Sequence, residues 1–147
     1  MKDWGNMKLL IDTNVVLDVL LRREPFFRAA AEVLNLTQRD EVWEYVSASA
    51  ITDIYYIANK QMKDRDAVRD LLKRLLMIVS VAAVSEWEIQ NALNLAWGDF
   101  EDSVQYSVAL LNEMDGIVTR NPSDYQDANI RIWLPEQALE LFANEGS

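Results

Sequence analysis

The chain has 147 residues, half of them apolar, and a formal net charge of −10 at pH 7. This length and composition favour a single domain over residues 1–147, with its core at about 8–142. Because the sequence contains neither Cys nor His, disulfides, Ser-His triads and zinc sites built from thiolate or imidazole ligands are excluded. Any metal would need oxygen ligands, which Mg²⁺ and Mn²⁺ prefer.

The acidic excess is concentrated in one part of the chain. Residues 1–84 carry 12 acidic and 12 basic side chains, whereas residues 85–129 carry nine acidic side chains and one basic residue, Arg120. Overall acidity argues against unassisted, non-specific binding to nucleic acid. Two interpretations stay open: the acidic residues form a solvated face, or some of them converge on a site that cations neutralise.

No apolar run reaches the roughly 18 residues that a membrane span needs, and the first residues lack the apolar centre of a signal peptide. We therefore expect a cytoplasmic protein that has no membrane partner.

The first apolar run, over residues 8–11, is followed by Asp12, Thr13 and Asn14 and then by apolar residues with helical spacing. Continuous apolar runs are typical of strands that are buried on both faces of a parallel sheet. Asp12 would then lie at the carboxyl end of a strand, where open α/β sheets place their ligands. We expect Thr13 and Asn14 to cap the following helix. The alternative is that Asp12 is merely a cap.

Strands and helices alternate along the rest of the chain. Further strands are predicted at 43–48, 79–84, 116–119 and 130–134. Helices are predicted at 26–36, 50–62, 63–78, 85–97, 100–114 and 135–144. We expect Ser49 to cap the helix that starts at residue 50, and Ser85 with Glu88 to form a capping box. The alternation predicts a three-layer α/β/α domain with a five-stranded, mainly parallel sheet.

Four acidic residues occupy positions where an active site would form. Asp12 ends the first strand, and Asp124 follows the fourth strand. These two strands are the expected flanks of a topological switch point, so the two carboxylates could meet there. Asp53 and Asp102 lie in predicted helices. Spacing alone leaves open whether they join the site or are exposed or capping residues.

Four motifs in this order resemble those of the PIN domain family. They are LIDTNVVLDVL at 10–20, SAITDIYY at 49–56, DFEDSVQY at 99–106 and IVTRN at 117–121. The resemblance covers nearly the whole chain. It implies a PIN-like fold and a metal-dependent endoribonuclease similar to the VapC-like toxins of bacterial toxin–antitoxin pairs. It further implies an RNA substrate, a small antitoxin protein as partner and a homodimer.

The resemblance also assigns metal ligands. Asp12 and Asp102 match the first and third acidic residues of the family and are implied to bind Mg²⁺ or Mn²⁺ directly. Asp53 stands where the family commonly has Glu, one methylene longer, and is implied to be a ligand or to position the attacking water. A carboxylate-held divalent cation lowers the pKa of bound water and acts as a Lewis acid, as phosphodiester hydrolysis requires.

Four further residues are implied to surround this centre. Asn121 occupies the position where the family commonly has a fourth acid, and Asp124 follows three residues later. Together they would complete the rim or a weak second metal site. The Thr13 hydroxyl is expected to orient Asp12. For Arg120 two roles stay open, a phosphate contact and a structural counter-ion.

Two rival functions are considered. A haloacid-dehalogenase-like phosphatase also places Asp after its first strand, but it needs a second Asp where this chain has Asn14. A catalytically weak PIN-like module that binds RNA or protein is favoured slightly by the substituted second and fourth positions. Phosphatase and RNA-cleavage assays distinguish these possibilities.

Overall fold

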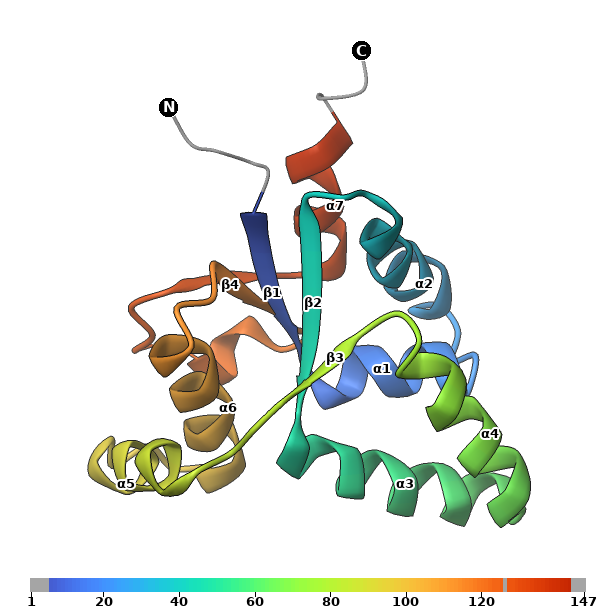
Figure 1. Ribbon diagram of the computed structural model, residues 1–147, viewed down its shortest axis with the longest axis horizontal. Coiled ribbons are helices and arrows are strands. Elements are labelled where there is room, and N and C mark those ends of the chain that lie inside the picture. Colours follow the sequence, from blue (N-terminus) through green and yellow to red (C-terminus); the bar gives the residue numbers. More distant parts are fainter. Residues whose placement is uncertain (1–5, 126, 144–147) are drawn as a thin grey trace.

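The computed structural model describes residues 6–125 and 127–143. Its middle layer is a five-stranded sheet with the order β3-β2-β1-β4-β5, in which every pairing is parallel (Figure 1). The strands are β1 (Met7–Ile11), β2 (Val42–Ser47), β3 (Ser80–Ala82), β4 (Gly116–Val118) and β5 (Arg131–Trp133). The expected five-stranded parallel sheet is confirmed. β1 and β4 are neighbours, as the predicted switch point requires.

Helices cover both faces of the sheet, and Figure 1 shows α5 and α6 on the opposite side of β1 and β2 from α1 to α4. One face packs against α1 (Thr13–Leu20), α2 (Phe27–Asn35), α3 (Ala48–Met62), α4 (Arg65–Leu75) and α7 (Pro135–Ala143). The other face packs against α5 (Glu86–Asn94) and α6 (Phe100–Leu111). Two short 3₁₀ helices, η2 (Leu36–Gln38) and η3 (Pro122–Tyr125), lie in the connections.

The apolar run of β1 divides between the two layers because successive side chains of a strand point to opposite faces. Leu9 and Ile11 enter the core beneath α1, α2 and α3, whereas Leu10 enters the core beneath α6. All three are fully buried. This double burial explains why the sequence of β1 shows no polar alternation.

Several helices start at a side-chain cap. The Ser47 hydroxyl accepts from the Ala50 backbone N–H at 3.2 Å, so the prediction of Ser49 as the cap was wrong. The reason is that β2 continues through Ser47 and passes directly into α3. The capping box of Ser85 and Glu88 is confirmed.

The other predicted boundaries differ by a few residues. The helix predicted at 63–78 covers only Arg65–Leu75. It starts later than predicted because Lys63 ends α3 in the left-handed conformation (φ 54°). Beyond its end, Met77 is 83% exposed. β3 is an edge strand and keeps three of its six predicted residues. The predicted end of the last helix, residue 144, lies outside the described residues. None of the described helices is both long enough and apolar enough to cross a membrane.

One charged residue on β2 lies inside the core. The Glu44 side chain is 3% exposed, and neither of its carboxylate oxygens has a hydrogen-bond partner within the described part of the chain. Burial in this environment raises the pKa of Glu44 well above its ordinary value of 4.5. The folded protein therefore holds a proton at Glu44 over a pH range in which the unfolded chain has lost it.

Replacing Glu44 with Met is expected to stabilise the protein at alkaline pH by about 1–3 kcal/mol, the cost of an unpaired buried polar group. Because the folded state binds the extra proton, wild-type stability should fall as the pH rises from about 4.5 through the raised pKa, and Glu44→Met should flatten this fall. Urea unfolding between pH 5 and pH 9 measures the effect. The matched control is Glu140→Met, since Glu140 is exposed on α7. Parallel pH profiles for wild type and Glu44→Met would contradict the prediction.

Candidate active site

A cleft of about 540 Å³ opens where β1, β2 and β4 end. Its walls come from the start of α1, from α3, α5 and α6, and from η3, which are far apart in the sequence. The lining residues are Asp12, Thr13, Asn14, Ser49, Ala50, Asp53, Ile57, Ile89, Phe100, Glu101, Asp102, Val104, Gln105 and Asp124. The structure thus brings together the four carboxylates that the sequence places in separate segments.

Asp12 lies at the bottom of this arrangement, with 7% of its surface exposed. Its Oδ1 accepts from the Thr13 backbone N–H at 2.7 Å and from Gln105 Nε2 at 3.2 Å. Its Oδ2 accepts from the Thr119 hydroxyl at 2.8 Å and, in a longer contact of 3.4 Å, from the Tyr125 hydroxyl. Four donors compensate for the loss of water around the carboxylate and fix its orientation.

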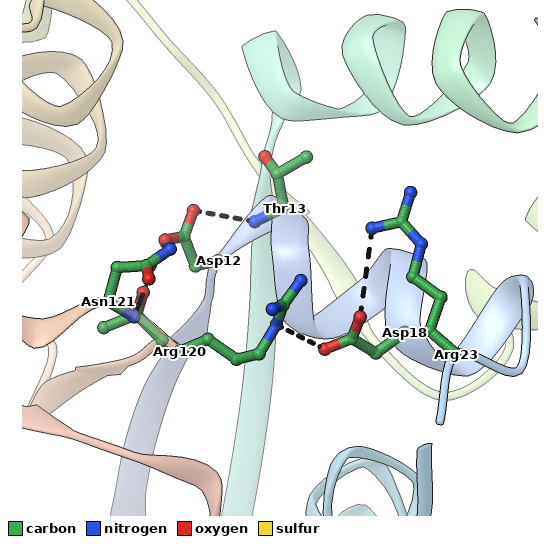
Figure 2. Close-up of polar contacts among 7 residues, drawn as sticks. Asp12, Thr13, Asp18, Arg23, Arg120 and Asn121 are labelled. Atoms are coloured by element: carbon green, nitrogen blue, oxygen red, sulfur yellow. Dashed lines mark hydrogen bonds and ion pairs between the residues drawn. The ribbon is translucent and has the colours of Figure 1, made fainter. Parts of the chain in front are cut away.

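Asp12 is also the N-cap of α1, so the expectation that Thr13 and Asn14 cap this helix was wrong. Both residues lie within α1, and the dashed line in Figure 2 joins Asp12 to the backbone nitrogen of Thr13. The hydroxyls that contact Asp12 belong to Thr119 and, at a longer distance, to Tyr125. The capping interpretation of Asp12 is therefore correct, but the same carboxyl group also lines the cleft.

Two further acids of the cleft, Asp102 and Glu101, have a raised pKa. Desolvation and then the charges of Asp99, Asp124, Asp12 and Glu101 raise the pKa of Asp102 from 3.8 to about 7. Desolvation also raises the pKa of Glu101.

Glu101 was not predicted as a site residue. After desolvation, the next cause of its raised pKa is the nearby charge of Asp53. Glu101 therefore brings a further carboxyl group to the α3 side of the cleft, next to the short Asp53.

No Lys or Arg is among the residues described as lining the cleft. Arg120 lies nearby, but its Nε is 2.7 Å from Asp18 Oδ2, and its guanidinium group lies 4.0 Å from the centre of the Phe26 ring. Figure 2 shows the Asp18 carboxylate between the side chains of Arg120 and Arg23. Of the two roles left open for Arg120, the structure shows the structural counter-ion.

Asp18 is fully buried on α1, and the sequence pattern did not identify it. Burial raises its pKa, while Arg120 and Arg23 partly offset this rise. The ion pair between Asp18 and Arg120 links α1 to the segment that follows β4. Because Asp12 is the N-cap of α1 and Thr119 directly follows β4, this ion pair stabilises the arrangement that holds the two residues together.

Asn121 and Asp124 are separated by the fold. Asp124 lies in η3 and lines the cleft, whereas Asn121 is exposed and lines a neighbouring hollow with Phe26 and Arg120. Asn121 contacts the site through its backbone N–H, which donates to the Thr119 hydroxyl at 3.1 Å. The acidic residue that this segment contributes to the cleft is therefore Asp124, which lies in η3.

Sequence reasoning also missed Gln105, Thr119 and Tyr125. Gln105 is three residues after Asp102, on the same face of α6, so helical spacing was an available signal. Thr119 lies inside the quoted motif at 117–121 and follows β4, which gave a second signal. For Tyr125, whose pKa is raised by burial and by Asp12, we find no signal in the sequence.

The donor set suits a hard divalent cation. The cleft offers carboxylate, hydroxyl and amide oxygens, and it contains one buried acceptor without a partner among the described residues, Gln105 Oε1. As they stand, no three acidic side chains in the described segments converge closely enough to hold a metal ion. A cation would therefore have to draw carboxylates of the cleft inward.

Comparison with known proteins places this geometry in context. The model of the PIN domain family matches residues 8–123. None of the curated proteins compared matches the chain at a significant level.

Solved structures share the fold. A toxin–antitoxin complex from Klebsiella pneumoniae is similar with a TM-score of 0.64 and 19% identity, covering 86% of this chain and 97% of that one. VapBC2 from Rickettsia felis, bound to a DNA fragment of its promoter, gives 0.65 and 14%, covering 86% and 99%. VapC20 from Mycobacterium tuberculosis, described as a toxin that cleaves the sarcin–ricin loop, gives 0.60 and 16%, covering 74% and 86%. At these identities the similarity is one of fold.

Proposed function

The chain belongs to the PIN domain family, and from this premise we propose that it is a divalent-metal-dependent endoribonuclease that acts as the toxin of a toxin–antitoxin pair. The observation that carries the proposal is the cleft itself. Carboxylates from the N-cap of α1 and from α3, α6 and η3 line one cavity, and no basic residue among its described lining neutralises them. Such a site attracts cations, and a bound cation then attracts the phosphodiester that the acidic protein alone would repel.

The proposed ligands are Asp12, Asp102 and Asp53, and the proposed ion is Mg²⁺ or Mn²⁺. When bound, the ion supplies a hydroxide at neutral pH and stabilises the negative charge on the phosphoryl oxygens. The protein's own residues prepare the site. Four donors hold Asp12 in one orientation, so that its carboxylate needs no reorganisation. Asp53 and Glu101 form a carboxyl pair that positions the attacking water, and Asp124 completes the rim.

The test is an RNA-cleavage assay with Mg²⁺, with Mn²⁺ and with EDTA. The proposal expects internal cleavage of RNA in either metal and none in EDTA. Cleavage that persists in EDTA, or no cleavage in either metal together with full RNA binding, would reject it.

Divalent metal is expected to stabilise the fold. Binding to the native state alone adds roughly 2.7 kcal/mol at a metal concentration of 100 times the dissociation constant. For a domain of this size, this corresponds to a rise in melting temperature on the order of 5–10 °C. Thermal melting in Mn²⁺ and in EDTA measures the rise, with Asp102→Asn as the variant that should respond less. If millimolar Mn²⁺ does not change the melting temperature of the wild type, the carboxylates form no strong metal site.

The proposed partners are an antitoxin protein and a second copy of the chain, in the cytoplasm. Solved complexes of this fold that contain an antitoxin support the first. An antitoxin would block the cleft with Arg or Lys side chains, because charge-assisted contacts to carboxylates are strong. Expression alone should inhibit growth, and co-expression with the adjacent open reading frame should relieve the inhibition and give a complex on pull-down.

The second candidate is a catalytically weak PIN-like binding module. Its support is that Asp53 is shorter than the usual Glu and that Asn121 is not acidic. Binding of RNA without cleavage in Mn²⁺, together with normal growth on expression, would favour this module over the nuclease.

A further inference from the structure

Among the described residues that line the cleft, Gln105 is the one uncharged residue whose side chain donates a hydrogen bond to Asp12. It lies on α6, is 5% exposed and lines the cleft. Its Nε2 donates to Asp12 Oδ1 at 3.2 Å, whereas its Oε1 is buried and has no hydrogen-bond partner among the described residues. The inference below rests on the proposed metal-dependent function.

The orientation of this amide is determined by its neighbour. Asp12 Oδ1 already accepts a hydrogen bond from the Thr13 backbone N–H, so it acts as an acceptor and the amide nitrogen faces it. Turning the amide over would place two acceptor oxygens against each other. The carbonyl oxygen is therefore held on the side of the amide that faces away from Asp12 Oδ1.

A buried carbonyl oxygen without a donor is costly, so such atoms usually have a partner that is absent from the bare protein. The lining residues include no Lys or Arg that could donate to it. Mg²⁺ and similar ions are commonly held by one or two carboxylates and retain several waters, which are strong donors. Water bound to the ion that Asp12 holds would lie next to the amide that holds Asp12.

We propose that Gln105 is a positioning residue of the metal site, which orients Asp12 through its Nε2 and accepts a hydrogen bond from a metal-bound water through its Oε1. The nitrogen and the oxygen of the Gln105 amide would then each contact a ligand of the same metal ion. Partners of this kind orient the ligands of metal sites, and their loss typically weakens metal affinity 10- to 100-fold.

The experiment is a calorimetric titration of the full chain with Mn²⁺, comparing wild type with Gln105→Met. Met has nearly the same length and volume, but it has no donor and its thioether sulfur is only a weak acceptor. The expected result is an affinity about 10- to 100-fold weaker, with a melting temperature in EDTA close to that of wild type. Gln90→Met is the matched control, because Gln90 is exposed on α5 and lies outside the cleft. Equal Mn²⁺ affinities for wild type and Gln105→Met would overturn the proposal.

A second measurement needs no variant and keeps the proposal testable if Gln105→Met does not fold. On addition of Mg²⁺, the side-chain carbonyl resonance of Gln105 should shift with the midpoint of metal binding, and that of Gln90 should not. An unshifted Gln105 resonance at saturating metal would also overturn the proposal. If the wild type binds no metal at all, the proposed function fails, and this outcome is distinct from metal binding that is unaffected by Gln105→Met.

Discussion

Asp12→Asn and Asp102→Asn should each abolish metal-dependent RNA cleavage while leaving the fold intact. A metal ion contributes several kcal/mol of transition-state stabilisation, and each 1.4 kcal/mol corresponds to about a tenfold change in rate. Losing a charged ligand should therefore reduce the rate by at least about a thousandfold. Asn preserves the shape of the side chain and is as good an N-cap as Asp, so α1 should still begin at residue 13.

The assay compares cleavage rates in Mn²⁺ at equal concentrations of folded protein. Asp70→Asn is the matched control, since Asp70 is exposed on α4 and lies outside the cleft. Asn121→Ala should have a smaller effect, because Asn121 meets the site only through its backbone N–H among the contacts described. Full activity in either Asp12→Asn or Asp102→Asn would disprove the assignment of that residue.

The largest loss of stability is expected for Arg120→Met. It would leave Asp18 fully buried, with only the more distant Arg23 at 3.9 Å as counter-ion. Removing one partner of a buried ion pair costs about 3–5 kcal/mol, a large part of the roughly 5–15 kcal/mol that stabilises a typical domain. Urea unfolding measures this loss.

Two variants serve as comparisons. Arg28→Met removes an exposed ion pair with Glu32 and should cost at most about 0.5 kcal/mol. The double variant Asp18→Asn/Arg120→Met should regain part of the loss, because the unpaired charge is gone. If Arg120 instead binds phosphate, Arg120→Met would raise KM for RNA and leave the unfolding curve unchanged.

Much of the fold could be predicted because local patterns decide it. The apolar run of β1 and the alternation of strands and helices identify the parallel sheet, and the capping box at Ser85 identifies the start of α5. In the site, the predictable residues were those that follow the end of a strand or stand in a motif of the family resemblance. Asp12, Asp53, Asp102 and Asp124 all line the cleft.

The remainder depends on tertiary packing that a single sequence does not display. Asp18 occupies an ordinary polar position in the pattern of α1, and only the approach of Arg120, about a hundred residues later, makes it a buried ion-pair partner. Thr119 replaces Thr13 as the hydroxyl donor because β4 lies beside β1. Helical spacing places Gln105 on the same face of α6 as Asp102, but it does not predict that the amide of Gln105 reaches Asp12.

The contacts of Asp12 have a consequence for synthesis on the ribosome. Asp12 is made among the first residues, but the side chains that hold it follow 93, 107 and 113 residues later. A growing chain that has not yet released Tyr125 from the exit tunnel cannot assemble this carboxylate in its final orientation, however early β1 and β2 fold. The arrangement around Asp12 would therefore be complete only after the segment through Tyr125 has left the tunnel, and any activity that depends on the orientation of Asp12 would appear no earlier than that.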